Sequence, residues 1–416
     1  MSEPRANPKR RWRQFSLRTL FALVTLCGIG LGLVGRELAQ TRREQAVLAD
    51  HHHFVSDVEY HDSPLPGWLS RHIRRVKSIR VIAIDEFGTL DRLRDLERLE
   101  SLVVSADDAD ISPLASLTSL RRLVLAHSNV CDLSPIAGLT QLRQLDISHT
   151  EVQYLSPLAH MTELQHLNLE CTWVSDLSPL SQLVNLETIN AFACGPIADL
   201  GPLAGAQNLK ELTVTGIVRD LSPLAKLTQL EELDVSGEMR DLSPLAELAQ
   251  LEGLSVISDE IEDLSPLTDL QDFRRLTLSS DSLRDITPLA NLHELRWLTL
   301  RGALLQDIAP LRSLKQLEHL RLIKSQVDDV TALAELTHLT FIDLDKTRIR
   351  DISPLRHLSR LEDLHLDETL VEDLTPLTSL SRLESLWLRN TPLSPDHVAT
   401  IKKALPNCEI AYKPLD

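Results

Sequence analysis

Leucine and other aliphatic residues recur along most of the chain in the pattern Leu-x-x-Leu-x-Leu. The intervals between successive starts are 21 to 23 residues and most are 22. A period of this length predicts a repeat protein in which each coil contains one short strand and one short helical turn. The starts are Val76, Leu99, Leu120, Leu142, Leu164, Leu186, Leu209, Leu230, Leu251, Phe273, Leu295, Leu317, Leu339, Leu361, Leu383 and Leu405.

The first half of each repeat alternates between apolar and polar residues, as an extended strand does when one face is buried. The fourth and sixth positions are expected to point inward, as in the pairs Leu145 and Ile147, or Leu320 and Leu322. Each strand would pair in parallel with the strand of the next coil. All inward residues then share one core, so a single coil could not fold alone.

The second half of each repeat contains a turn with the sequence Asp-Leu-Ser-Pro-Leu or a close variant. Serine or threonine is expected to cap the helical turn, and proline suits its first position because no N–H is needed there. The flanking leucines are expected to be buried beneath the turn. The motif spans residues 176–180, 220–224, 241–245 and 263–267, and variants begin at Asp285, Asp307, Asp351 and Asp373.

These repeats resemble the leucine-rich-repeat family, and the 22-residue unit with Asp-Leu-Ser-Pro-Leu resembles its bacterial internalin-like subclass. The resemblance covers roughly residues 76–410. It implies an α/β repeat solenoid, a curved right-handed coil with a parallel β-sheet on the concave face. Short 3-10 or helical turns would cover the convex face. The family also implies ligand binding, mainly on the concave face, and not catalysis.

The chain departs from the family at the position that usually holds a buried asparagine. Hydroxyl and thiol residues stand there, and we expect them to bond backbone amides; they are Thr150, Thr172, Cys194, Ser325, Thr347, Thr369 and Thr391. Asp259 and Asp281 fit this position less well. We expect no counterpart of the sandwich domain and wall anchor of internalins, so a role in invading host cells is not predicted.

The N-terminal segment, residues 15–35, is apolar and of the length needed to span a bilayer. We expect an uncleaved transmembrane helix after a basic cytoplasmic tail, residues 1–14. The excess of Lys and Arg before the helix keeps the N-terminus cytoplasmic and places the C-terminal solenoid outside the cytoplasm. A cleaved signal peptide is the alternative, but no small-x-small cleavage site precedes Arg36.

The remaining boundaries follow from the repeat starts and from breaker residues. Residues 36–66 are predicted to be a juxtamembrane linker, with a histidine tract at His51 to His53 that we interpret as solvated. Residues 67–98 would form an N-terminal cap and first coil, including a short helix from Trp68 to Arg75. Residues 99–393 are the repeats, and residues 394–416 are a C-terminal cap of one helix and one strand.

Charge and cysteine content narrow the classes of partner. The formal net charge is −17 and no basic stripe is present, which argues against a nucleic-acid partner. The five cysteines are too few and too dispersed for a disulfide framework or a paired-cysteine zinc site. Cys194 and Cys408 fall on inward positions. Cys171 and Cys194 lie in neighbouring repeats, so a disulfide between them is a minor alternative.

The third, fifth and seventh positions of each strand are expected to face the concave side. In the first half of the solenoid these residues are mostly small and polar. The second half concentrates the residue types that dominate binding interfaces. The predicted ligand-binding residues are Trp297, Arg301, His319, Arg321, Phe341, Asp343, Asp345, Asp363, His365, Asp367, Trp387 and Arg389.

Two interpretations of this surface stay open. Trp297, Phe341 and Trp387 could anchor a protein or peptide, or the whole set could be a solvated ladder of charges. A third alternative is a hard divalent ion such as Ca²⁺, bound by the set Asp343, Asp345, Asp363, His365 and Asp367. Arg321 and Arg389 on flanking strands could neutralise these carboxylates instead, and no resident metal or cofactor is predicted.

The function predicted from the sequence is that of a membrane-anchored leucine-rich-repeat protein that binds an unidentified protein or peptide. The alternative is an envelope scaffold or self-associating protein without a discrete ligand site. An enzyme is not expected, because the sequence contains no nucleophile with its base, no phosphate-binding glycine loop and no closed metal site.

Overall fold

The computed structural model describes residues 36, 39–46, 55–60, 76–81, 90, 93–104, 110–302 and 304–414. The predicted transmembrane helix, the histidine tract and the predicted helix from Trp68 to Arg75 all lie outside these residues. Among the residues that are described, no helix combines the length and apolar character needed to cross a bilayer.

One 17-stranded sheet contains all the strands of the described residues. Each strand from β2 onward pairs in parallel with the strand of the next coil, whereas β1 pairs with β2 in antiparallel fashion. The strands are β1 Val55–Tyr60, β2 Val76–Val81, β3 Ser101–Val104, β4 Arg122–Val124, β5 Gln144–Asp146, β6 His166–Asn168, β7 Thr188–Ala191, β8 Glu211–Val218, β9 Glu232–Gly237, β10 Gly253–Ile257, β11 Arg275–Ser279, β12 Trp297–Arg301, β13 His319–Ile323, β14 Phe341–Asp343, β15 Asp363–His365, β16 Ser385–Thr391 and β17 Glu409–Pro414.

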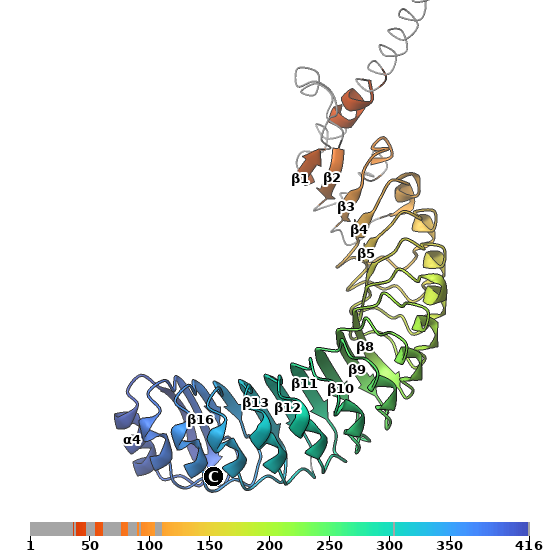
Figure 1. Ribbon diagram of the computed structural model, residues 1–416. Helices are drawn as coiled ribbons and strands as arrows, with labels where there is room; N and C mark the ends of the chain where they lie inside the picture. Colours follow the sequence, from red (N-terminus) through yellow and green to blue (C-terminus); the bar gives the residue numbers. More distant parts are fainter. Residues whose placement is uncertain are drawn as a thin grey trace, which may run out of the picture.

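Short 3-10 turns alternate with the strands, and one α-helix follows the last repeat. Figure 1 shows the strands lining the inner side of an open arc and the turns lying along its outer side. The turns are η1 Ser112–Ser116, η2 Ser134–Ile136, η3 Ser156–Leu158, η4 Ser178–Gln182, η5 Gly201–Leu203, η6 Ser222–Leu224, η7 Ser243–Leu245, η8 Ser265–Leu267, η9 Thr287–Asn291, η10 Ala309–Ser313, η11 Thr331–Glu335, η12 Ser353–His357 and η13 Thr375–Ser379, and the helix is α4 Pro395–Ala404. The predicted fold class is confirmed.

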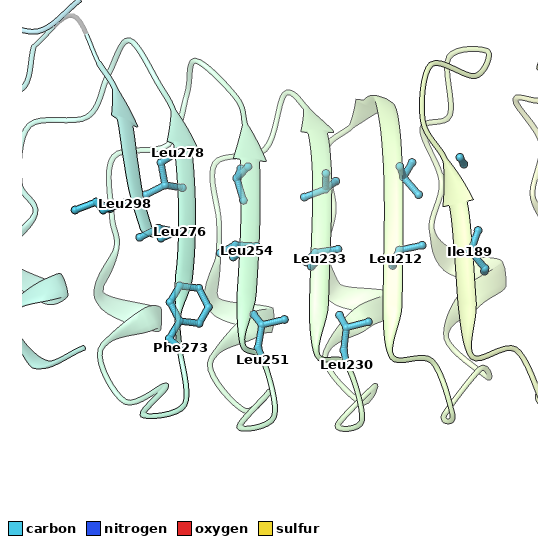
Figure 2. Packing of buried hydrophobic residues seen from close by; sticks show 14 of the residues in the cluster. Ile189, Leu212, Leu230, Leu233, Leu251, Leu254, Phe273, Leu276, Leu278 and Leu298 are labelled. Atoms are coloured by element: carbon cyan, nitrogen blue, oxygen red, sulfur yellow. The ribbon is translucent and has the colours of Figure 1, made fainter. Parts of the chain in front are cut away.

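The core is a continuous column of aliphatic side chains between the sheet and the turns. Both predicted inward pairs, Leu145 with Ile147 and Leu320 with Leu322, are buried. Figure 2 shows equivalent residues such as Leu212, Leu233 and Leu254 aligned from strand to strand. Each coil therefore covers the core of its neighbour, and the large apolar area removed from water stabilises the stack.

The aspartate of each turn motif, and not the serine or threonine, caps the 3-10 turn. In the coil of Asp220, the carboxylate accepts a 2.8 Å hydrogen bond from the backbone N–H of Ser222 and a second bond from the Ser222 hydroxyl. The prediction of a serine cap was therefore wrong, because serine is already the first residue of the turn. In eleven other coils an aspartate carboxylate likewise accepts a hydrogen bond from the backbone N–H of the residue two positions later. These aspartates are Asp110, Asp132, Asp176, Asp199, Asp241, Asp263, Asp285, Asp307, Asp329, Asp351 and Asp373.

The buried threonines after the strands bond carbonyls and not the amides we expected, whereas the buried Ser325 hydroxyl makes no hydrogen bond with the described residues. The Thr150 hydroxyl donates to the carbonyl of Ile147 at 2.6 Å, and Thr172, Thr347, Thr369 and Thr391 repeat this bond. A hydroxyl is a donor, and the carbonyl three residues earlier is within its reach.

Two aspartates do not occupy this buried position, contrary to the sequence alignment. Ser258 and Ser280 are buried there instead, and their hydroxyls donate to the carbonyls of Met239 and Ile261. Asp259 and Asp281 are exposed. In these two coils the buried hydroxyl lies one residue earlier than in the coil of Ser325, and both carboxylates remain exposed.

Cysteines of neighbouring coils do not form a disulfide. Cys171 and Cys194 are both free, and they face different ways because they occupy adjacent positions in their coils. The thiol of Cys194 points inward and donates to the carbonyl of Leu169 at 3.0 Å, and burial raises its pKa. Cys194 and Cys408 are half-buried and pack against the core.

The C-terminal end of the solenoid is covered by helix α4 and strand β17. Ser394 is the N-cap of α4, and Val398 and Ile401 are buried against the last coil. The hydroxyl of Tyr412 on β17 donates to the carbonyl of Leu393 at 2.7 Å. These contacts fix the last strand beside β16.

Candidate binding surface on the concave face

Strands β12 to β16 bring the predicted ligand-binding residues into three rows that run along the solenoid. Trp297, His319, Phe341 and Asp363 are paired in register in the first row. The second row contains Arg321, Asp343, His365 and Trp387. Arg301, Asp345, Asp367 and Arg389 take the equivalent third position in their repeats. Parallel pairing without a shift places each row at the strand spacing of about 4.8 Å.

Five rings form a continuous strip across these strands, which we call the aromatic strip: Trp297, His319, Phe341, His365 and Trp387. Trp297 stacks on His319 with ring centroids 3.7 Å apart, and His319 lies 5.9 Å from Phe341. Phe341 is 5.2 Å from His365, which is 5.3 Å from Trp387. All five residues are among those predicted from the sequence, but the contacts through which the histidines connect the larger rings are not evident from it.

Two arginines lie over rings of the strip. The guanidinium carbon of Arg321 is 4.9 Å from the centre of the Phe341 ring, and that of Arg389 is 4.4 Å from the centre of the Trp387 ring. A guanidinium over a ring face is attracted by the ring quadrupole, which favours one orientation of both groups. The strip is therefore an ordered apolar surface with cations above it.

The aspartates of the same surface hold the backbone as well as carrying charge. The Asp343 carboxylate accepts a 3.1 Å hydrogen bond from the backbone N–H of Asp345. The Asp345 carboxylate accepts one of 2.8 Å from the backbone N–H of Asp367, and the Asp367 carboxylate accepts one of 2.7 Å from that of Arg389. Asp343 is only 6 % exposed, so it is not an open contact residue. In the first half of the solenoid Asp146, Asn168 and Asn190 make the equivalent local bond.

Close packing of these carboxyl groups changes their acidity. Burial, followed by the negative charge of Asp343, raises the pKa of Asp345 to about 6. Burial also lowers the pKa of His319, because the strip removes water from the imidazole. The surface therefore holds one carboxyl group, Asp345, that is harder to ionise than usual, and one imidazole, His319, that is harder to protonate than usual.

Three of the five residues predicted for a divalent ion come together. Asp343, Asp345 and His365 each offer a ligand atom, and these atoms lie within 4.8 Å of one another. The Arg321 Nε lies 3.8 Å from an Asp343 carboxylate oxygen, so one of the two predicted neutralising arginines does occupy this place. Arg389 instead lies over Trp387.

A hollow lies on the first half of the concave face, where the sequence predicts mostly small polar residues. It has a volume of about 450 Å³ and runs over strands β4 to β8. Its lining includes Arg122, Gln144, His166, Thr188 and Glu211. No residue pattern along the chain marks this hollow.

Comparisons with known proteins agree with this architecture. The family model "Leucine Rich repeats (2 copies)" matches residues 140–182. An internalin from Listeria monocytogenes is 27% identical, with a TM-score of 0.61, over 77% of this chain and 88% of that one. No curated protein matches the sequence.

Two further solved structures share the fold at lower identity. A leucine-rich-repeat protein from Leptospira interrogans is 18% identical, with a TM-score of 0.62, over 79% of this chain and 93% of that one. The leucine-rich-repeat ectodomain of a membrane receptor kinase from Arabidopsis thaliana is 17% identical, with a TM-score of 0.61, over 78% of this chain and 46% of that one. Residues 140–182 therefore match a leucine-rich-repeat model, and the solenoid as a whole shares its fold with leucine-rich-repeat structures that include an internalin.

Proposed function

We propose that this protein binds another protein or a peptide through the aromatic strip on strands β12 to β16. The observation that carries the proposal is the unbroken series of ring contacts from Trp297 to Trp387, with Arg321 and Arg389 above it. Tryptophan and arginine provide most of the binding energy in protein interfaces when they lie at the centre of a contact.

The exposed parts of the strip favour a partner with an apolar surface and acidic groups. Four rings of the strip are half-buried, namely His319, Phe341, His365 and Trp387. Trp297 is 50 % exposed at the end of the strip. Arg301, Arg321 and Arg389 are exposed beside the rings and can bond carboxylates of a partner in a bidentate manner.

The function of the family supports the same proposal. Leucine-rich-repeat proteins generally mediate protein–protein binding. The Arabidopsis receptor ectodomain was solved in complex with a second molecule, CASPARIAN STRIP INTEGRITY FACTOR 2. That partner belongs to the receptor; what we carry over is the class of ligand, a protein or peptide, and not its identity.

We further propose that residues 15–35 anchor the protein in a membrane as a single helix. The support is the apolar sequence of this segment and the basic residues that precede it, which favour a cytoplasmic N-terminus. The solenoid would then meet its partner outside the cytoplasm. The matched part of the Arabidopsis receptor is likewise the ectodomain of a membrane protein.

The test is capture of a partner by the full chain, solubilised in detergent, from a membrane and envelope extract. The triple variant Trp297→Ala, Phe341→Ala, Trp387→Ala removes the large rings of the strip. The matched control is Tyr154→Ala, Trp173→Ala, which removes two side chains that are 73 % and 65 % exposed but lie off these strands. All proteins are first compared for thermal stability.

We expect one partner to be retained by the parent and the control, and its capture to fall at least about tenfold with the triple variant, since hot-spot residues each contribute about 2 kcal/mol or more. Equal capture by all three proteins would exclude the aromatic strip as the binding site. Contacts spread along the solenoid edges, found by crosslinking in membranes, would favour the envelope scaffold instead.

A further inference from the structure

A row of metal-binding side chain types crosses three neighbouring coils, far from the aromatic strip. His127, His149 and Cys171 occupy the same position in successive repeats, just after β4, β5 and β6. Each has a left-handed backbone, with φ of 57°, 54° and 53°. Each donates its backbone N–H to a carbonyl of the next coil, at 2.9, 2.7 and 2.9 Å. This ladder holds the three side chains side by side.

Donor atoms of two of these coils converge on one point. His149, Glu170 and Cys171 each offer a ligand atom, and these atoms lie within 4.8 Å of one another. The Nε2 atom of His149 is 3.7 Å from the Oε1 atom of Glu170. The other carboxylate oxygen of Glu170 accepts a 3.1 Å hydrogen bond from Asn190, which fixes the direction of Oε1.

We propose that His149, Glu170 and Cys171 form a zinc site. Thiolate, imidazole and carboxylate are the three ligand types that Zn²⁺ takes, and a mixed set containing sulfur disfavours Ca²⁺ and Mg²⁺. Tetrahedral ligands of zinc lie about 3.3 to 3.7 Å apart, as bond lengths of about 2.0 to 2.3 Å require. Small rotations of these side chains would bring the donor atoms from within 4.8 Å of one another to that separation. The fourth coordination position of the zinc ion would then be open to water.

The surroundings of the site suit this role. The ring of His127 stacks on that of His149, with centroids 4.3 Å apart and planes inclined by 11°, which orients the imidazole. Asn190 orients the carboxylate in the way that outer hydrogen bonds orient metal ligands. Cys171 is half-buried and free, so its sulfur is available to an ion from solution.

Comparison with other parts of the solenoid shows why the proposal is confined to these coils. The next coil has Ala193 at the same left-handed position, and coils nearer the C-terminus have Lys324, Lys346, Glu368 and Asn390. Their backbone conformation is the same, but none of these residues offers a sulfur ligand. The group of Asp343, Asp345 and His365 already has the cation of Arg321 beside it. The zinc site is independent of the proposed function on the aromatic strip.

The test is metal binding by the full chain, reduced, metal-free and in detergent. Co²⁺ serves as the probe, because a thiolate bound to Co²⁺ gives a charge-transfer absorption that oxygen and nitrogen ligands do not. Histidines elsewhere, including His51 to His53, cannot produce this signal. The variants are Cys171→Ser and His149→Gln, and the matched controls are Cys131→Ser and His160→Gln, which change exposed residues of the same types.

We expect the parent and both controls to bind one equivalent of Co²⁺ with the thiolate band, and Zn²⁺ to displace it. Cys171→Ser should abolish the band, and His149→Gln should weaken the affinity at least about tenfold. Circular dichroism establishes that each variant is folded. Absence of the band in the parent, its persistence in Cys171→Ser, or unchanged affinity in His149→Gln would overturn the proposal.

Discussion

At the scale of single residues, the concave face shows how one side chain can serve both the fold and the surface. Asp345 accepts a backbone hydrogen bond from Asp367, yet it lies near a second carboxylate in a half-buried place. The hydrogen bond stabilises the charged form, whereas burial and the charge of Asp343 destabilise it. The two destabilising effects prevail, because the pKa of Asp345 is raised from 3.8 to about 6.

This raised pKa predicts a pH-dependent effect on stability. The folded protein holds the Asp345 proton more tightly than the unfolded chain, so the stabilisation is complete below about pH 4 and is lost as the pH rises through about 6. Asp345→Asn should therefore be more stable than the parent at pH 7.5 by about 1 to 2 kcal/mol, after screening by water. At pH 4 the difference should nearly disappear.

Urea unfolding of both proteins at the two pH values measures the difference. Asp259→Asn is the control, because that carboxylate is exposed. The asparagine oxygen can still accept the bond from Asp367, so the backbone arrangement is retained. A variant that is less stable than the parent at pH 7.5 would mean that the charged form is favoured there.

At the scale of elements, the 3-10 turn depends on the aspartate that precedes it. In the coil of Asp176, hydrogen bonds from the backbone N–H and then from the hydroxyl of Ser178 lower the pKa of the carboxyl. The coil of η3 differs, because Tyr154 stands where the other coils have aspartate. Its side chain is 73 % exposed, so it does not replace the cap by packing against the core.

Restoring the cap in this coil should stabilise the protein. Tyr154→Asp should raise the free energy of unfolding by about 0.5 to 1 kcal/mol, the usual contribution of a capping side chain. Tyr154→Ala removes the tyrosine without adding a cap and is the matched control. Thermal unfolding above pH 5 compares the three proteins, and equal stability of the Asp and Ala variants would show that the carboxylate does not cap η3.

At the scale of the whole molecule, stability comes from contacts between neighbouring coils. Leu322 on β13 has no exposed surface and belongs to the column of residues seen in Figure 2 on other strands. Leu322→Ala leaves a cavity that rigid neighbouring coils cannot fill, so we expect a loss of about 2 to 5 kcal/mol.

Denaturant unfolding followed by circular dichroism tests this loss. Leu370→Ala is the control, because that side chain is 37 % exposed and its truncation should cost well under half as much. A similar cost for both variants would contradict the view that the inner column, and not the outer surface, holds the coils together.

The architecture of the repeats is determined by the sequence. The leucine at the fourth position of each repeat is removed from water only in the shared core, and such a leucine recurs about every 22 residues. Strand positions, burial of the pairs such as Leu320 and Leu322, and the residues of the concave face therefore follow from periodicity. Local chemistry was harder to assign, as the aspartate cap and the carbonyl bond of Thr150 show.

Only the tertiary structure decides which side chains of different coils meet. Residues 22 apart in sequence become neighbours at the strand spacing, but their rotamers decide whether rings stack, as Trp297 and His319 do, or whether a carboxylate turns to a backbone N–H, as Asp343 does. The donors His149, Glu170 and Cys171 carry no spacing signal of a zinc motif, because sheet pairing and a left-handed turn bring them together. The sequence by itself thus determines the solenoid, and packing between coils determines its sites.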